Sequence, residues 1–488
     1  MRTIVVVSKA SDWPLEIPGA EPVLAKDYLI DPGWTSARNI KAFNLCRSYR
    51  YQSEGYYVSL LGAARHHRPF PSLMTVLDMR SRALVRTVDD DLDALIQKSL
   101  GALGSKKFEL SIYFGKNLAK TYNRLARSLF ATFPAPLLRA SFTKGKRWRL
   151  SSVTPIAFRE VPESHHEFFQ QAASEYFGRP RYQVRSRQRP RFDLAILYDP
   201  AEELAPSGEK ALACFAEAGE KVGFGVEMIR REDYGRLGEF DALFIRETTA
   251  INHHTFRFAQ RAEADGLIVI DDPQSILRCT NKVFQSEAFG IGNVPTPKTL
   301  ITDQINVEEI ESKIGFPCVL KYPDSSFSRG VIRCNDRIEL EHHASAANKE
   351  SDLLLVQEYM PTDFDWRIGI FNREALFACR YHMAKGHWQI VKQTQTGRYR
   401  YGHVDTLPLD EVPPRLIKIA LRAAATIGDG LYGVDLKEAG RRVVVTEVND
   451  NPNIDCGCED VVLKKELYRR IMSGFLERVE KKQRGAQT

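Results

Sequence analysis

The chain has 488 residues, of which 43% are hydrophobic and 27% charged. This length suggests about three domains, and the composition is ordinary for a globular protein. No apolar run approaches the ~20 residues of a transmembrane helix, and the first one, residues 4–7, is too short for a signal peptide. We therefore expect a cytoplasmic protein without membrane contact. The eight scattered cysteines fit reduced thiols, and the net charge of +7 permits anionic substrates without requiring nucleic acid, which we do not expect as a partner.

Residues 1–180 form the first predicted domain, in which we identify no chemistry from the residues alone. It opens with a strand over residues 3–8, and a helical pattern then follows from Ser36 through Phe43, Leu45 and Tyr49. We find no internal repeat along the chain.

A basic stretch closes this domain with six arginines: Arg179, Arg181, Arg185, Arg187, Arg189 and Arg191. It is either a polyanion-binding arm with the interleaved aromatics Tyr182 and Phe192, or a solvated linker over residues 181–191. We favour the linker, because a new periodic pattern starts at this point.

In residues 192–275, strands alternate with helices, which predicts βαβ units and a parallel sheet. Neither a G-x-G-x-x-G fingerprint nor a Walker A sequence is present. Three polar residues follow the end of one strand, where open α/β sheets bind ligands, and are candidates for the substrate side: Arg246, Glu247 and Thr248.

Residues 276–361 and 362–488 are predicted as two α+β units. In the first, Lys321 lies in an apolar strand, where an ammonium group is costly to bury unless it meets an anion such as phosphate. The loop that follows can close over phosphates with hydroxyl and backbone N–H groups, and its serines are Ser325, Ser326 and Ser328. The strand end at residues 357–360 can bond adenine through its backbone, and Asp365 can accept from ribose.

Residues 431–453 predict two strands joined by a tight turn at residues 438–441. With a period of two, one face of the second strand carries Val443, Val445, Glu447 and Asn449. Asp435 falls opposite Glu447, so two carboxylates and an amide oxygen converge as Mg²⁺ prefers; the alternative is a polar turn with solvent-facing acids. We interpret the neighbouring thiols, Cys456 and Cys458, as small packing residues.

From about residue 193 to residue 480 the chain resembles the RimK type of ATP-grasp ligase. The motifs that carry this resemblance are TNKVF, VLKYPDSSFSRGV, VQEYMPTDFDWR, GVDL and TEVNDNPNID. The first 180 residues resemble the N-terminal domain found ahead of some RimK-like modules. The implied fold is α/β and α+β multidomain: an N-terminal α/β domain (1–180), a parallel-sheet pre-ATP-grasp domain (192–275), a small ATP-grasp subdomain (276–361) and a C-terminal metal-binding subdomain (362–488).

The resemblance also implies roles for single residues. Lys282 and Lys321 would hold the ATP phosphates, with Arg380 near the transferred phosphoryl group. The adenine and ribose would be framed by Gln357, Glu358, Tyr359, Met360 and Asp365. Mg²⁺, as two ions and with Mn²⁺ as an alternative, would be bound by Asp435, Glu447 and Asn449. The chain departs from the family in its phosphate loop, where Gly330 is the remaining glycine, and at Gln389, Ile390 and Val391, where the family has Arg-Ser-Asn.

The implied function is an ATP- and Mg²⁺-dependent carboxylate–amine ligase working through an acylphosphate. It would add glutamate or another amino acid to a carboxylate-bearing amino acid, peptide, protein or metabolite. A homo-oligomer is suggested by family analogy alone. Two alternatives are a Mg–ATP small-molecule kinase, which would make a phosphoester instead of an amide, and a non-catalytic nucleotide-binding module that binds RNA or protein.

Overall fold

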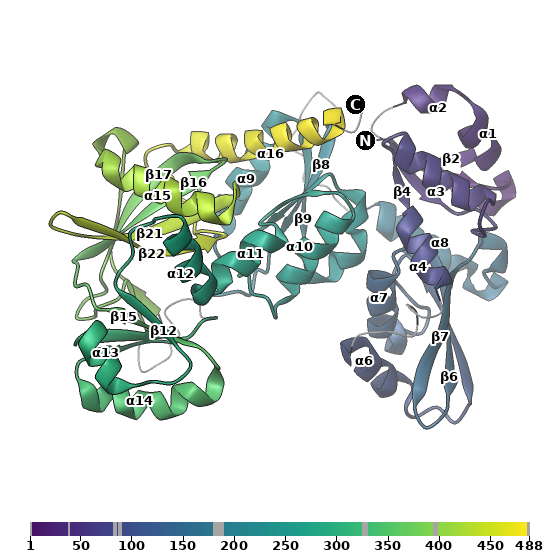
Figure 1. The fold of residues 1–488 in the computed structure, drawn as a ribbon. Coiled ribbons are helices and arrows are strands. Elements are labelled where there is room, and N and C mark those ends of the chain that lie inside the picture. Colours follow the sequence, from purple (N-terminus) through teal and green to yellow (C-terminus); the bar gives the residue numbers. More distant parts are fainter. Residues whose placement is uncertain are drawn as a thin grey trace. The chain divides into compact units, whose positions relative to one another are not determined.

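The computed structural model describes residues 2–37, 40–81, 85, 90–178, 190–324, 330–393 and 399–485 (Figure 1). Backbone contacts divide the chain into two compact units. The first contains residues 1–195 and 223–241, and the second contains residues 196–222 and 242–488. Five of the six arginines of the basic stretch, all except Arg191, lie outside the described residues.

The first unit opens with a parallel sheet of order β2-β1-β3-β4. Its strands are β1 (Arg2–Val7), β2 (Ala20–Leu24), β3 (Ile40–Asn44) and β4 (Arg68–Phe70), and its helices are α1 (Ala25–Ile30), α2 (Gly33–Ser36), α3 (Glu54–Ala64) and α4 (Leu73–Arg80). The helix predicted from Ser36 is wrong. All five residues of β3 are buried, and a strand that is covered on both faces has no period of two to distinguish it from a helix.

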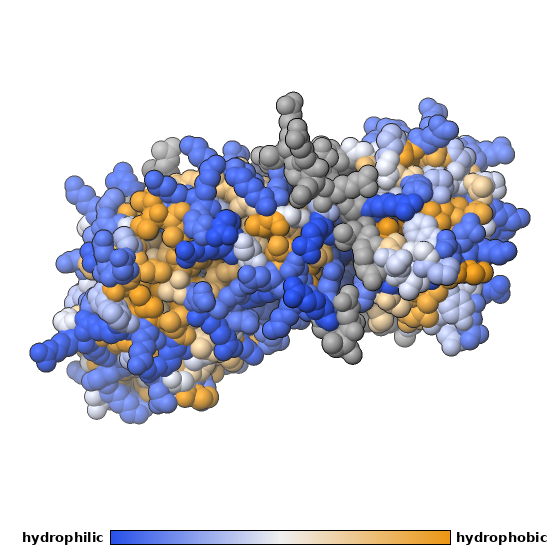
Figure 2. All heavy atoms as spheres, turned by 90° about the horizontal axis from the view of Figure 1, so that it is seen from above, coloured by the Kyte–Doolittle hydropathy of each residue, from blue (hydrophilic) through white to orange (hydrophobic). Residues whose placement is uncertain are grey.

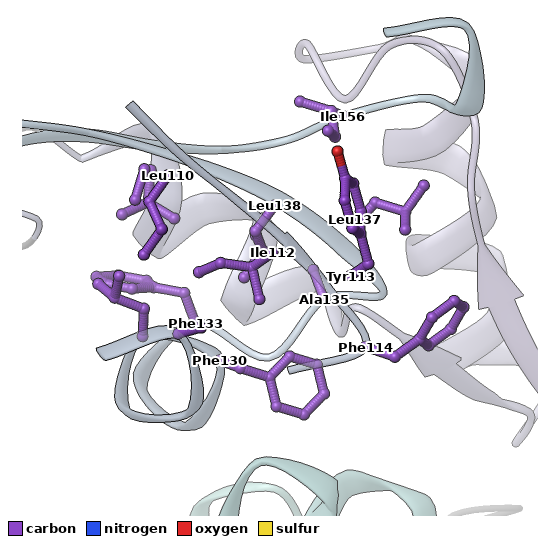
Figure 3. Packing of buried hydrophobic residues seen from close by; sticks show 14 of the residues in the cluster. Leu110, Ile112, Tyr113, Phe114, Phe130, Phe133, Ala135, Leu137, Leu138 and Ile156 are labelled. Atoms are coloured by element: carbon purple, nitrogen blue, oxygen red, sulfur yellow. The ribbon is translucent and has the colours of Figure 1, made fainter. Parts of the chain in front are cut away.

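An antiparallel sheet of order β5-β6-β7 completes the N-terminal region. It comprises β5 (Lys107–Tyr113), β6 (Leu137–Lys144) and β7 (Trp148–Pro155), with α6 (Asp90–Leu100), α7 (Asn123–Thr132) and α8 (His166–Phe177). Apolar side chains of β5, β6 and α7 meet in its core, among them Ile112, Phe130 and Leu138 (Figure 3).

A buried ion network also belongs to the first unit. Arg236, in the 3₁₀ segment η5 (Arg231–Glu239), donates to Glu227 at 2.6 Å and to Glu239 at 3.1 Å. Glu239 accepts from Tyr176 and lies 3.8 Å from the Lys41 ammonium, which is 3.2 Å from Asp193. Burial opposes ionisation of Glu239, but Arg236 and Lys41 outweigh it and hold the pKa at about 2.

A second four-stranded sheet has the order β9-β8-β10-β11, and β10 and β11 pair in parallel as predicted. Its strands are β8 (Phe192–Leu197), β9 (Phe224–Ile229), β10 (Ala242–Ile245) and β11 (Ile268–Ile270), and its helices are α9 (Glu209–Val222), α10 (His254–Ala264) and α11 (Pro273–Thr280).

This sheet repeats the first one, so the prediction of no internal repeat is wrong. The strand orders match, and α3, β4 and α4 reappear 200 residues later as α10, β11 and α11 with identical lengths. The left-handed residue after the first helix is His66 in one copy and Gly266 in the other. The second helix is capped by Ser72 in one copy and by Asp272 in the other, each accepting from the N–H three residues on. Between residues 54–80 and 254–280 the only identical pairs are Ala64/Ala264 and Leu77/Leu277.

The rest of the second unit contains two further sheets, of orders β12-β15-β13-β14 and β20-β17-β16-β21-β22, and a small hairpin of β18 (Val391–Gln393) and β19 (Tyr399–Tyr401). The smaller of the two sheets consists of β12 (Thr299–Thr302), β13 (Cys318–Lys321), β14 (Val331–Cys334) and β15 (Leu354–Glu358), with α12 (Lys282–Ile291), α13 (Val307–Lys313) and α14 (Arg337–Glu350). The larger consists of β16 (Phe364–Phe371), β17 (Glu374–His382), β20 (Val404–Leu407), β21 (Leu431–Ala439) and β22 (Arg442–Asp450), with α15 (Pro414–Ile427).

Helix α15 covers one face of the larger sheet, where Leu416 and Ala423 pack with Trp366 and Val434. The terminal helix α16 (Lys465–Gly485) runs along α9 (Figure 1). On the face drawn in Figure 2, apolar side chains are interspersed among hydrophilic ones. Within the described ranges, no helix combines the length and the apolar character needed to span a bilayer.

Candidate active site

The metal ligands predicted from the sequence come together on the hairpin β21–β22. In the antiparallel register Asp435 faces Glu447 and Gly433 faces Asn449. The Asn449 amide donates to Asp435 Oδ2 at 3.0 Å. The expectation that Val443 and Val445 share this face is wrong. A bulge shifts the register at Asp435, which turns both valines to the core under α15 and leaves Glu447 and Asn449 beside Asp435.

Two protein cations lie against these acids. Arg367 holds both oxygens of Asp435, at 2.7 and 2.8 Å, and Lys282 lies 3.2 Å from Glu447. Burial raises the pKa of Asp435, and Arg367 opposes that shift. The donor set fits Mg²⁺, which takes one or two carboxylates and completes its shell with water and phosphate oxygens. Among the described residues no cluster of three or more His, Cys, Asp or Glu could hold a metal, and the side chain next to the two carboxylates that could add a further oxygen ligand is Asn449.

A hollow with about 330 Å³ of empty space, partly open to solvent, adjoins Lys282. One face of the small sheet supplies Lys321, Leu355, Gln357 and Thr299, which alternate with residues of the opposite, core face. The hollow is also lined by Gln285, Ser286, Phe289, Thr296, Val445 and Thr446. The sequence analysis did not identify the apolar residues that line the hollow. Leu355 could have been found, because it lies two positions before Gln357 in β15 and therefore on the same face.

Lys321 is half-buried in this hollow, and none of the described residues forms an ion pair or hydrogen bond with its ammonium group. Burial lowers its pKa to about 8, although Glu447 favours the charged form. An ammonium group held in this way has a strong preference for an anionic ligand.

The predicted nucleotide-binding residues lie at the carboxyl end of β15, an inner strand of the small sheet. Gln357 donates to Thr299 at 2.9 Å, and Glu358 pairs with Arg442 and accepts from the Lys298 N–H. The Arg333 guanidinium lies 4.2 Å from the ring centroid of Tyr359. The side chain of Met360 is buried.

Asp365, the predicted ribose ligand, is half-buried and pairs with Lys437. The predicted phosphate-binding serines Ser325, Ser326 and Ser328 lie outside the described residues.

The structure corrects the expectation for Arg380. Opposite residues of an antiparallel pair share a face, and Arg380 faces Trp366 on the side covered by α15. Its guanidinium lies 4.6 Å from the Trp366 ring and 5.0 Å from the Phe364 ring. The arginine beside the metal acids is therefore Arg367, which the sequence analysis did not select.

The substrate-side candidates lie just after β10. Arg246 is fully buried, Glu247 Oε2 accepts from His254 Nε2 at 2.6 Å, and the Thr248 N–H donates to Glu202. The two cysteines near the hairpin have other neighbours: Cys456 Sγ is 3.9 Å from Cys214 Sγ, and the Cys458 carbonyl accepts from Thr406.

Comparison with known proteins agrees with this geometry. Residues 278–466 match the RimK-like ATP-grasp domain family, and residues 25–172 match the RimK-like ATPgrasp N-terminal domain family. The second unit is thus an ATP-grasp module. The chain therefore contains a RimK-like ATP-grasp domain and, ahead of it, a RimK-like ATPgrasp N-terminal domain.

Two curated relatives each cover 48% of this chain. The alpha-aminoadipate–LysW ligase LysX of Saccharolobus solfataricus is 29% identical over 257 residues, 86% of its own length. The tetrahydromethanopterin:alpha-L-glutamate ligase of Methanocaldococcus jannaschii is 25% identical over 240 residues, 78% of its length.

Two solved structures are similar to part of this chain. The D-alanine–D-alanine ligase of Bacillus anthracis has a TM-score of 0.44 at 14% identity and covers 59% of this chain and 98% of its own. A RimK domain ATP-grasp protein of Sphaerobacter thermophilus has a TM-score of 0.44 at 16% identity, with 58% and 99% covered.

Proposed function

We propose that the protein is an ATP- and Mg²⁺-dependent ligase that joins a carboxylate to the amine of an amino acid through an acylphosphate. The observation that carries this proposal is the convergence of Asp435, Glu447 and Asn449 next to a hollow that contains two lysines. The relatives named above are ligases of amino acids or related carboxylates, which supports glutamate or another amino acid as one substrate. The other would be a carboxylate-bearing amino acid, peptide, protein or metabolite.

The hollow is suited to the nucleotide. Lys321 and Lys282 at its rim would bind phosphate oxygens, and Phe289, Leu355 and Val445 offer an apolar wall that suits a flat base. When bound, Mg²⁺ would neutralise charge on the transferred phosphoryl group. Lys321 would share that task, because its ammonium group has no anion of its own among the described residues.

Arg367 takes the place that the sequence analysis gave to Arg380. Its bidentate bond fixes the Asp435 carboxylate and opposes the rise in its pKa that burial causes. Its guanidinium lies 4.8 Å from the ring of Tyr381, whose hydroxyl donates to Glu459. Arg367 lies on the sheet face that carries Asp435, Glu447 and Asn449.

Hydroxylamine trapping tests the proposal. The protein is incubated with Mg–ATP, hydroxylamine and a pool of amino acids and acidic peptides. An acylphosphate gives a hydroxamate, which Asp435→Asn and Glu447→Gln should abolish. ATP hydrolysis without hydroxamate from any pool member, or a stable phosphoester, would contradict the ligase and favour the kinase alternative.

A further inference from the structure

Arg246 is the largest buried cation of the second unit that the proposed chemistry does not use. It donates from Nη1 to Asn451 Oδ1 at 2.6 Å and from Nη2 to the Pro452 carbonyl at 2.9 Å. It also donates to the Pro206 carbonyl at 2.7 Å and to Ser207 Oγ at 2.7 and 3.1 Å. Phe215 and Phe244 lie within 5.7 Å of the guanidinium. The Arg246 guanidinium thereby links the end of β10 to residues 206–207 and to residues 451–452.

Two of these bonds end on the residues that follow the metal ligand Asn449. Asn451 adopts a left-handed backbone, with φ 46°, directly after β22 ends at Asp450. Its amide donates back to the Glu247 carbonyl at 2.5 Å, and Thr249 donates to Asp450 Oδ2 at 2.6 Å. Residues 246–249 therefore hold each of residues 450–452 individually, and the strand with Glu447 and Asn449 is fixed at its carboxyl end.

The internal repeat shows that the sheet itself does not need this arginine. Position 246 corresponds to Leu45 in the first copy, because the Leu45 N–H donates to the Val6 carbonyl as the Arg246 N–H donates to the Leu197 carbonyl. Leu45 is an apolar, buried residue. Position 249 corresponds to Tyr49, whose hydroxyl donates to the Asn44 carbonyl of its own copy. The capping and left-handed positions match between the copies, whereas positions 246 and 249 differ. In its described part, the first copy has no strand with candidate metal ligands beside it. We therefore attribute the difference at positions 246 and 249 to the metal site and not to the needs of the fold.

We propose that Arg246, assisted by Thr249, is a positioning residue of the metal site: it fixes residues 450–452 and through them sets the places of Asn449 and Glu447. The inference rests on the proposed function, because it assumes a bound metal. The hydrogen bonds of Arg246 go to residues 206, 207, 451 and 452, so it would act on the metal ligands through the chain that follows them. Groups that orient metal ligands in this way typically change metal affinity or activity by about 10–100-fold when they are replaced.

Arg246→Lys tests this role, since lysine keeps the charge but loses the planar fork. Its matched control is Arg478→Lys, because Arg478 likewise donates to an asparagine Oδ1, that of Asn372, and to a backbone carbonyl, that of Asp429. Thr249→Val removes one hydroxyl without changing shape, and its control is Thr426→Val, whose hydroxyl bonds within α15. The affinity for Mn²⁺ is measured by electron paramagnetic resonance with a β,γ-methylene analogue of ATP present.

The expected result is a loss of Mn²⁺ affinity of about 10-fold or more for Arg246→Lys, a smaller loss for Thr249→Val, and less than twofold for both controls. Binding of the analogue in chelator should not change, because Lys282 and Lys321 lie elsewhere. A folded Arg246→Lys with wild-type Mn²⁺ affinity would overturn the inference, and if that variant does not fold, an unchanged Thr249→Val does so. Weakened Mn²⁺ binding in a protein that makes no hydroxamate would uphold the inference while refuting the ligase.

Discussion

Replacing Lys321 by methionine should make the metal-free protein more stable while it destroys nucleotide binding. The pKa of Lys321 falls from 10.5 to about 8 because burial disfavours the charged form. At pH 7 this shift costs the folded state about 3 kcal/mol. The cost is fully present below pH 8 and vanishes as the pH rises past 10.5, because the lysine is then neutral in both states. Methionine fills similar space without a charge, so Lys321→Met should gain about 2–3 kcal/mol at pH 7 and almost nothing at pH 11.

Calorimetry in chelator at both pH values measures this difference, and a gain of that size raises the melting temperature of a unit this large by roughly 5–10 °C. Titration with ATP should show weakened binding in the same variant. The control is Lys437→Met, which should lose stability because it leaves Asp365 without its cation. The reasoning is refuted if Lys321→Met is destabilised as much as Lys437→Met, or if it binds ATP like the wild type.

Two further predictions concern single side chains. Arg367→Lys should lower the turnover rate by about 10–100-fold, because lysine cannot hold both oxygens of Asp435. Arg380→Lys should retain activity. Equal losses of activity for the two variants in steady-state assays would mean that Arg380 does act in the site. In the first unit, Glu239→Gln should destabilise by about 3–5 kcal/mol at pH 7, because it leaves Arg236 short of a partner. The pKa of Glu239 is depressed to about 2, so the difference in unfolding free energy between the wild type and Glu239→Gln should shrink as the pH falls from about 4 towards 2. If urea unfolding gives a difference that does not change with pH, the prediction is contradicted.

The convergence of the three candidate metal ligands could be predicted from the sequence because it is local. Asp435, Glu447 and Asn449 lie on two strands joined by one turn, and the turn alone fixes the register to within a residue. Lys321 was found because a charge in an apolar strand is rare. The bulge after Asp435 could not be anticipated, since nothing in a row of valines marks the extra residue.

Features that depend on distant pairing could not be predicted. Arg367 and Arg380 lie on neighbouring strands, and only the register and the position of α15 decide which of them reaches Asp435. The internal repeat leaves two identical residues in its best-matched segment, because a sheet and its helices need only apolar positions and caps to be preserved. The sequence of β3 does not distinguish a strand from a helix, because β3 is buried on both faces and therefore lacks the alternation of polar and apolar residues.

The most direct test of the ligase is Mg²⁺-dependent ADP release with a pool of amino acids and acidic peptides, read together with the intact masses of the products. The account predicts release that requires an amine, a product heavier by one residue, and no signal from Asp435→Asn. ADP release whose only product is a phosphorylated pool member would contradict it.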